Sequence, residues 1–82
     1  MTVRLGEDGT IRLDGACPIE DAETLQMLLL SNTGAPVDWT ACDQAHSAVI
    51  QVLIVAKPTL LGPPRDGVLK NLIEPMIRSA KV

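Results

Sequence analysis

The sequence predicts an α/β fold in which a small mixed β-sheet is covered by about three helices, in one domain over residues 1–82. Three observations predict it. Apolar and polar residues alternate near the N-terminus, as in β-strands, whereas apolar residues recur every three or four positions in later segments, as in helices. A chain of 82 residues has room for a single hydrophobic core. Strands that alternate with helices favour a helical layer packed on a sheet.

The composition limits both the core and the function. Apolar residues make up 46% of the chain and charged residues 21%, but there is no Phe, no Tyr and one Trp. The core must therefore be aliphatic, and the aromatic platforms that stack on single-stranded nucleic acid are missing. Seven basic and ten acidic side chains give a net charge of −3. We therefore expect no nucleic-acid partner, because phosphate backbones attract basic surfaces.

We expect a cytoplasmic protein without direct membrane insertion. No apolar signal core follows Met1, and the longest apolar run, Val52–Ala56, is too short to cross a bilayer. Cys17 and Cys42 are not spaced as C-x-x-C, and with a single His they cannot form a structural zinc site. We expect buried, reduced thiols, no metal and no cofactor.

The N-terminal segment predicts a β-hairpin followed by a helix. Residues 3–5 and 11–13 alternate apolar and polar, and the Gly6–Gly9 segment between them is typical of a turn. Pro18 suits the first turn of a helix, and acidic residues favour its N-terminal end. The apolar stripe of this helix consists of Ile19, Ala22, Leu25, Leu28 and Leu29.

This helix should end before Thr33, and Met27 and Leu30 lie off its apolar stripe, so we expect both to be exposed. A short strand is predicted over residues 36–39, followed by a loop over residues 40–47.

Residues 48–56 are apolar except for Gln51. The run could be a strand buried on both faces, but its length favours a helix that ends before Lys57. A helix that is apolar on every side needs cover on every side. A partner is the simplest cover. We expect a homo-oligomer, a dimer, in which a second chain completes part of the core.

The C-terminal third predicts one very short strand and one amphipathic helix. Residues 59–61 have room for the strand, and apolar residues at helical spacing run from Val68 to Ile77. Pro75 lies inside this helix and lacks a backbone donor, so the helix should be kinked or split near residues 71–74.

The segments Val37-Asp38-Trp39-Thr40 and His46-Ser47-Ala48-Val49 resemble the STAS domain, a family named from sulphate transporters and anti-sigma-factor antagonists. The family pattern is an apolar strand ending in Asp-x-Ser/Thr, a short loop, and Asp-Ser-x-Gly/Ala at the start of an apolar helix. The resemblance covers about residues 10–57. It departs from the pattern at His46, where the family usually has Asp, and at Ala48-Val49, which replace a glycine. The chain is also about one strand–helix unit shorter than a full STAS domain, so the resemblance implies a truncated STAS-like architecture.

The resemblance implies a non-enzymatic regulatory module that binds a protein partner of the anti-sigma-factor or serine-kinase type. Its binding face would be the loop 40–47 and the following helix, with Asp38, Thr40, Asp43, His46 and Ser47 as candidate residues. Ser47 stands at the position of the family's phosphoacceptor. The alternative is a constitutive accessory subunit, similar to the STAS subunits of bacterial lipid-transport ABC importers, bound to a transporter ATPase.

The residues themselves leave other roles open. Ser47 is also suited to a simple helix N-cap, and Thr40 to a hydrogen bond that fixes its loop. Cys42, Asp43, His46 and Ser47 lie within six residues, a grouping that a small thiol or serine hydrolase would need. No G-x-S-x-G elbow or second base accompanies them, so we expect no catalytic residues. Trp39 is either a core residue or an interface anchor, and a central strand favours the core.

Overall fold

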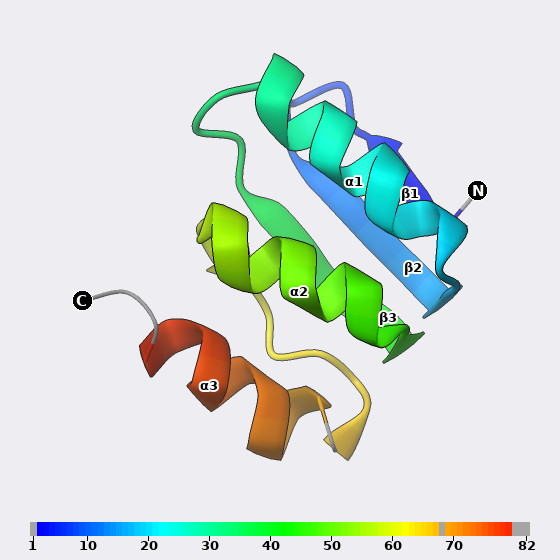
Figure 1. Ribbon diagram of the computed structural model, residues 1–82, viewed down its shortest axis with the longest axis vertical. Helices are drawn as coiled ribbons and strands as arrows, with labels where there is room; N and C mark the ends of the chain where they lie inside the picture. The colour runs from blue at the N-terminus through cyan, green and yellow to red at the C-terminus, as the bar shows by residue number, and fades with distance from the viewer. Residues whose placement is uncertain (1, 68, 80–82) are drawn as a thin grey trace.

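The computed structural model describes residues 2–67 and 69–79. It is an α/β fold with a four-stranded mixed sheet in the order β1-β2-β3-β4, which confirms the predicted fold class (Figure 1). The elements are β1 (Val3–Leu5), β2 (Ile11–Cys17), α1 (Glu20–Ser31), β3 (Val37–Ala45), α2 (Ser47–Ala56), β4 (Leu60–Leu61), the π-helix η1 (Leu69–Ile73) and α3 (Glu74–Ser79).

The predicted N-terminal hairpin is confirmed. β1 pairs antiparallel with β2, with Val3 opposite Leu13 and Leu5 opposite Ile11. In the turn, the Gly6 N–H donates to the Thr10 carbonyl at 2.8 Å. Gly9 has a φ of 85°, a conformation that a residue with a Cβ rarely adopts.

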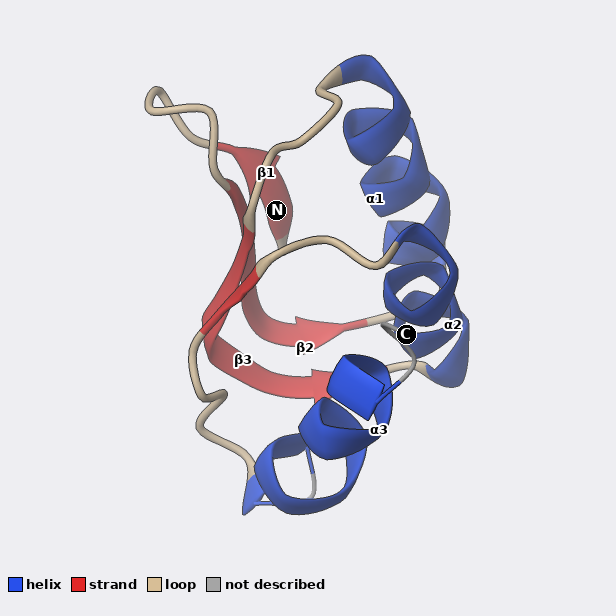
Figure 2. Cartoon of the chain, turned by 90° about the vertical axis from the view of Figure 1, so that its left-hand side faces the viewer, coloured by secondary structure: helices blue, strands red, loops and turns tan. Residues whose placement is uncertain are grey.

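β2, β3 and β4 are mutually parallel, so α1 and α2 each return the chain across the sheet to start the next strand. The two helices lie side by side on one face of the sheet (Figures 1 and 2). Leu25 of α1 is buried, and Met27 and Leu30 are exposed, as predicted. The prediction for Ile19 was wrong, because Ile19 precedes the helix as its N-cap residue and is 54% exposed.

The helical interpretation of the long apolar run is confirmed by α2. Val49 and Leu53 are buried against the sheet, as expected for residues four apart on one helix face. The helix ends at Ala56, before Lys57, as predicted. Lys57 is the C-cap residue; its backbone is left-handed with a φ of 51°, and its N–H donates to the Leu53 carbonyl at 3.0 Å.

The expected loop over residues 40–47 was wrong, because β3 continues to Ala45. β2 supplies the backbone partners for this extension, pairing Gly15 with Cys42 and Cys17 with Ala45. Two register shifts interrupt the pairing, and Gly15 has a φ of 68°, so the strands bend where the simple alternation of apolar and polar residues is lost.

The short strand predicted over residues 59–61 is confirmed as β4, and the last helix changes from a π-helix to an α-helix at the edge of the region where a kink or split was predicted. η1 ends at Ile73 and α3 begins at Glu74, which places Pro75 in the first turn of α3, where a missing N–H breaks no helical bond. Val68, the expected first residue of the stripe, lies outside the described residues.

The core lies between the sheet and the helices. It is aliphatic around a fully buried Trp39, as predicted, and Cys17 and Cys42 are buried free thiols. No helix among the described residues covers the opposite sheet face (Figure 2). On that face Arg12 pairs with Asp38 at 2.9 Å and Arg4 pairs with Asp14 at 3.0 Å. One face of the sheet is therefore buried under the helices, and the other is polar and exposed to solvent.

Candidate functional site

The N-terminus of α2 is capped by His46, not by Ser47. His46 is the N-cap residue, and its Nδ1 accepts a hydrogen bond from the Ala48 N–H at 3.0 Å. Its carbonyl accepts from the Val49 and Ile50 N–H groups at 2.8 and 3.2 Å. Its own N–H donates to the Cys17 carbonyl at 2.9 Å, which ties the helix start to β2. In the family pattern an Asp occupies this position, and Asp is a preferred N-cap residue. His46 fills the same role with a ring nitrogen as the acceptor.

Ser47 is therefore free of the capping role that its residue type suggests. It is the first residue of α2 and is exposed. Its hydroxyl makes no hydrogen bond within residues 2–67 and 69–79. The side chain is available for modification or contact.

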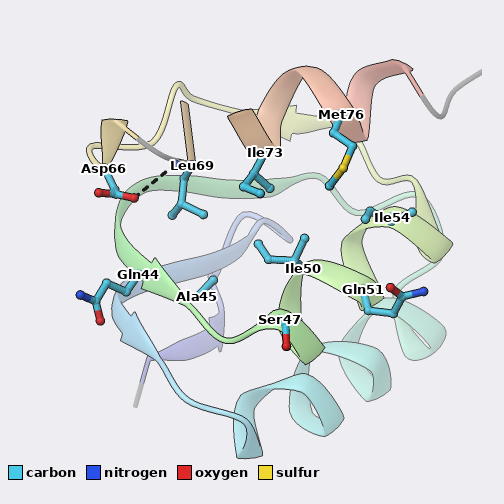
Figure 3. A pocket seen from close by; sticks show the side chains of 10 residues that line it. All are labelled: Gln44, Ala45, Ser47, Ile50, Gln51, Ile54, Asp66, Leu69, Ile73 and Met76. Carbon is cyan, nitrogen blue, oxygen red and sulfur yellow. Dashed lines mark hydrogen bonds between the residues drawn. The ribbon is translucent and has the colours of Figure 1, made fainter. Parts of the chain in front are cut away.

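Ser47 borders an open groove between α2 on one side and η1 and α3 on the other. The groove has a volume of about 680 Å³. Leu69, Ile73 and Met76 point across it toward Ile50 of α2 (Figure 3). The other residues that line the groove are Gln44, Ala45, Ser47, Gln51, Ile54 and Asp66. Its floor is apolar and its margin polar, as is usual for sites that bind a protein segment.

Asp66 holds the N-terminal end of η1, where the wall of the groove opposite α2 begins. The Asp66 carboxylate accepts from the Leu69 N–H at 3.2 Å, and its carbonyl accepts from the Lys70 N–H at 2.9 Å. The wall then consists of the π-helix turn and, after it, α3. Single π-helical turns are rare and frequently lie at functional sites.

Asp38 and Thr40 lie away from this groove, on the polar face of the sheet. Asp38 accepts from the Thr40 hydroxyl at 2.6 Å, the Thr40 N–H at 3.0 Å and Arg12 Nη1 at 2.9 Å. The hydrogen bonds from Thr40, with a smaller contribution from Arg12, lower the pKa of the Asp38 carboxyl. These two residues fix the backbone of β3, which was the alternative role considered for Thr40.

The five candidate residues thus do not form one surface. His46 and Ser47 lie together at the start of α2, whereas Asp38 and Thr40 belong to the sheet. Asp43 forms an exposed ion pair with Arg65 at 3.4 Å. The sequence did not indicate the C-terminal wall as part of a site, because its apolar stripe is equally typical of core. Only the structure shows that Met76 of this wall is 47% exposed and faces the groove.

The thiols of Cys17 and Cys42 and the imidazole of His46 make hydrogen bonds within the chain. A hydrogen bond with Cys42 and burial raise the pKa of the Cys17 thiol. Cys42 is fully buried, and its thiol donates to the Gln44 carbonyl at 3.3 Å. The Nδ1 atom of His46 is occupied by the Ala48 N–H and is not available as a base. Among the described residues, no group of His, Cys, Asp and Glu side chains is placed to hold a metal ion.

Substituting His46 tests the cap directly. We expect His46→Ala to lower the free energy of unfolding by about 0.5–2 kcal/mol, because the Ala48 N–H loses its acceptor. His46→Asn, which restores a short acceptor at the N-cap, should recover most of the loss. Urea unfolding followed by Trp39 fluorescence measures both variants. An equal loss in the two variants would show that Nδ1 does not cap α2.

No family model, curated protein or solved structure matches this chain. In the part of the chain that the structure describes, none of the helices has the length and apolar character needed to cross a membrane.

Proposed function

We propose that this chain is a cytoplasmic, non-enzymatic regulatory module of the STAS type, which binds a protein partner in the groove between α2 and the η1–α3 wall. Phosphorylation of Ser47 controls that binding. One observation carries the proposal: the serine that matches the family's phosphoacceptor is exposed, makes no hydrogen bond with described residues, and borders an apolar groove.

The groove suits a partner helix or loop that presents apolar side chains. Ile50 and Ile54 on one side and Leu69, Ile73 and Met76 on the other give it two apolar walls. Burying apolar side chains against these walls supplies affinity, and polar margin groups orient the partner. The resemblance favours a partner of the anti-sigma-factor or serine-kinase type.

A phosphate on Ser47 would weaken docking. It adds a charge of about −1.5 to −2 at the margin of the groove, which Asp66 also lines. The nearest helix N–H groups are already used, since Ala48 donates to His46 Nδ1 and both Val49 and Ile50 donate to the His46 carbonyl. With few free donors at the helix end, the phosphate stays solvated in the path of the partner and repels acidic groups there.

Pull-down of partners from the native host's lysate tests the switch. We expect one protein to bind the wild type and Ser47→Ala equally, and to bind Ser47→Glu about tenfold less or weaker, because the added charge faces the groove. Met76→Glu, which places a charge in an apolar wall of the groove, should also lose that protein. Leu5→Glu changes an exposed apolar residue on β1 and serves as the matched control.

Incubating the wild type with the lysate and Mg-ATP should add one phosphate at Ser47 by mass spectrometry, with none on Ser47→Ala. A partner retained equally by Ser47→Glu, together with no phosphate on the wild type, would contradict the switch. If that partner is a transporter ATPase, the chain is a constitutive accessory subunit. Rapid labelling of Ser47 or Cys42 by electrophiles at neutral pH would instead indicate a hydrolase.

A further inference from the structure

The outer surface of the helical layer carries an apolar patch that the proposed docking groove does not use. Met27 and Leu30 of α1 are 61% and 75% exposed, and Val55 of α2 is 70% exposed. These side chains lie on the helix faces opposite the buried Leu25 and Leu53, and so point away from the sheet. Exposed aliphatic side chains grouped on one small domain are typical of an interaction surface.

A hollow of about 290 Å³ lies between the two helices within this patch. Half-buried Leu29 and Val52 line it, and Leu30 and Val55 stand beside it as exposed side chains. Gln26 and Gln51 supply the polar groups of its lining. We call this surface the α1–α2 patch, defined by Gln26, Met27, Leu29, Leu30, Gln51, Val52 and Val55.

We propose that the α1–α2 patch binds a second copy of this chain in a twofold-symmetric homodimer. In such a dimer each surface meets itself, so one patch must offer both a protruding side chain and a hollow to receive it. The patch does this with Leu30 and Val55 beside a hollow with aliphatic walls. Its two amides each donate and accept hydrogen bonds, and so can pair with their own copies.

Charge complementarity favours the same arrangement. The patch itself contains no charged residue, but the acidic side chains of α1 are in its first turn and Lys57 follows the far end of α2. The two helices run in the same direction (Figure 1). In the proposed dimer the twofold axis is perpendicular to both helices, which places the acidic end of one copy at the same end of the interface as Lys57 of the other.

Glu23 lies on the same face of α1 as Met27 and Leu30, since these residues are four and seven positions apart. Within the described residues neither Glu23 nor Lys57 makes an ion pair. Glu23 of one copy is the natural partner for Lys57 of the other. Gln51 lines both surfaces, but none of the apolar residues of the patch lines the groove, so the inference does not rest on the proposed function.

Light scattering coupled to size-exclusion chromatography over a range of concentrations tests the dimer. The wild type should show twice the 8.7 kDa chain mass, and Leu30→Glu and Val55→Glu should each show one chain mass. Both positions are exposed in the single chain, so circular dichroism should confirm that the variants remain folded. Met76→Glu, a matched exposed apolar residue on the other flank of α2, should remain dimeric.

A charge exchange tests the orientation. Glu23→Lys and Lys57→Glu should each weaken the dimer, and the double variant should recover it. A wild type that stays monomeric at every concentration would overturn the proposal and leave the patch to a different protein. A dimer that persists in Leu30→Glu, or a double variant that fails to recover, would overturn the proposed interface. If Leu30→Glu is monomeric but still binds the partner in the pull-down, the dimer interface and the Ser47 switch are tested separately.

Discussion

Replacing Trp39 by alanine should lower the free energy of unfolding by about 3–5 kcal/mol. Trp39 is the only aromatic residue and is fully buried in β3, which lies inside the sheet between β2 and β4. Its removal leaves a large cavity that small aliphatic neighbours cannot fill. A domain of this size is stable by roughly 5–15 kcal/mol, so the variant is expected to approach the limit of folding.

The surroundings of Trp39 make a graded test available. A Cβ placed on Gly62 would lie 2.9 Å from Trp39 Nε1, so the indole packs directly on the chain after β4. Nε1 is buried and has no hydrogen-bond partner among the described residues. Trp39→Phe removes that unpaired donor and leaves a smaller cavity, so we expect a loss of about 1–2 kcal/mol.

Urea unfolding followed by circular dichroism compares the variants, because tryptophan fluorescence is lost in both. Met27→Ala, at an exposed position, is the control and should change the free energy of unfolding by less than about 0.5 kcal/mol. Equal stability of Trp39→Ala and the wild type would contradict the assignment of Trp39 to the core.

The fold was predictable where local periodicity decides structure. The alternation in β1 and β2, the length of the α2 run and the effect of Pro75 all depend on neighbours within one or two turns. The extension of β3 depends instead on backbone pairing with β2 around a bulge at Gly15. No pattern within residues 40–45 carries that information, so the sequence favoured a loop there.

The candidate site was predictable only at Ser47. Histidine is not among the favoured N-cap residues, so the sequence suggested that Ser47 could cap the helix, and the structure assigns that role to His46. The opposite wall of the groove comes from a segment about twenty residues later. Its apolar stripe predicted a helix, but whether Met76 faces core or groove depends on how that helix packs.

Asp38 should stabilise the fold at neutral pH through its three hydrogen bonds with Arg12 and Thr40. We expect Asp38→Asn to lower the free energy of unfolding by about 1–3 kcal/mol at pH 7, because bonds to a charged acceptor are stronger than bonds to an amide. Asp14→Asn is the matched control. Asp14 pairs with an exposed Arg4 on the same sheet face, so its loss should be under about 1 kcal/mol.

The pH dependence separates the charge of Asp38 from its shape. The pKa of Asp38 is lowered in the folded chain, so its contribution is complete above the unfolded value of about 3.9 and is lost as the pH falls through the folded value. The stability difference between the wild type and Asp38→Asn should therefore be constant from pH 7 to about pH 5 and shrink in stronger acid. Urea unfolding at a series of pH values measures it. A protonated carboxyl and an amide can make similar hydrogen bonds to Thr40, and neither carries the charge that holds Arg12, so the difference should shrink in acid. A difference that persists in acid would mean that Asp38 acts through its shape and not through its charge.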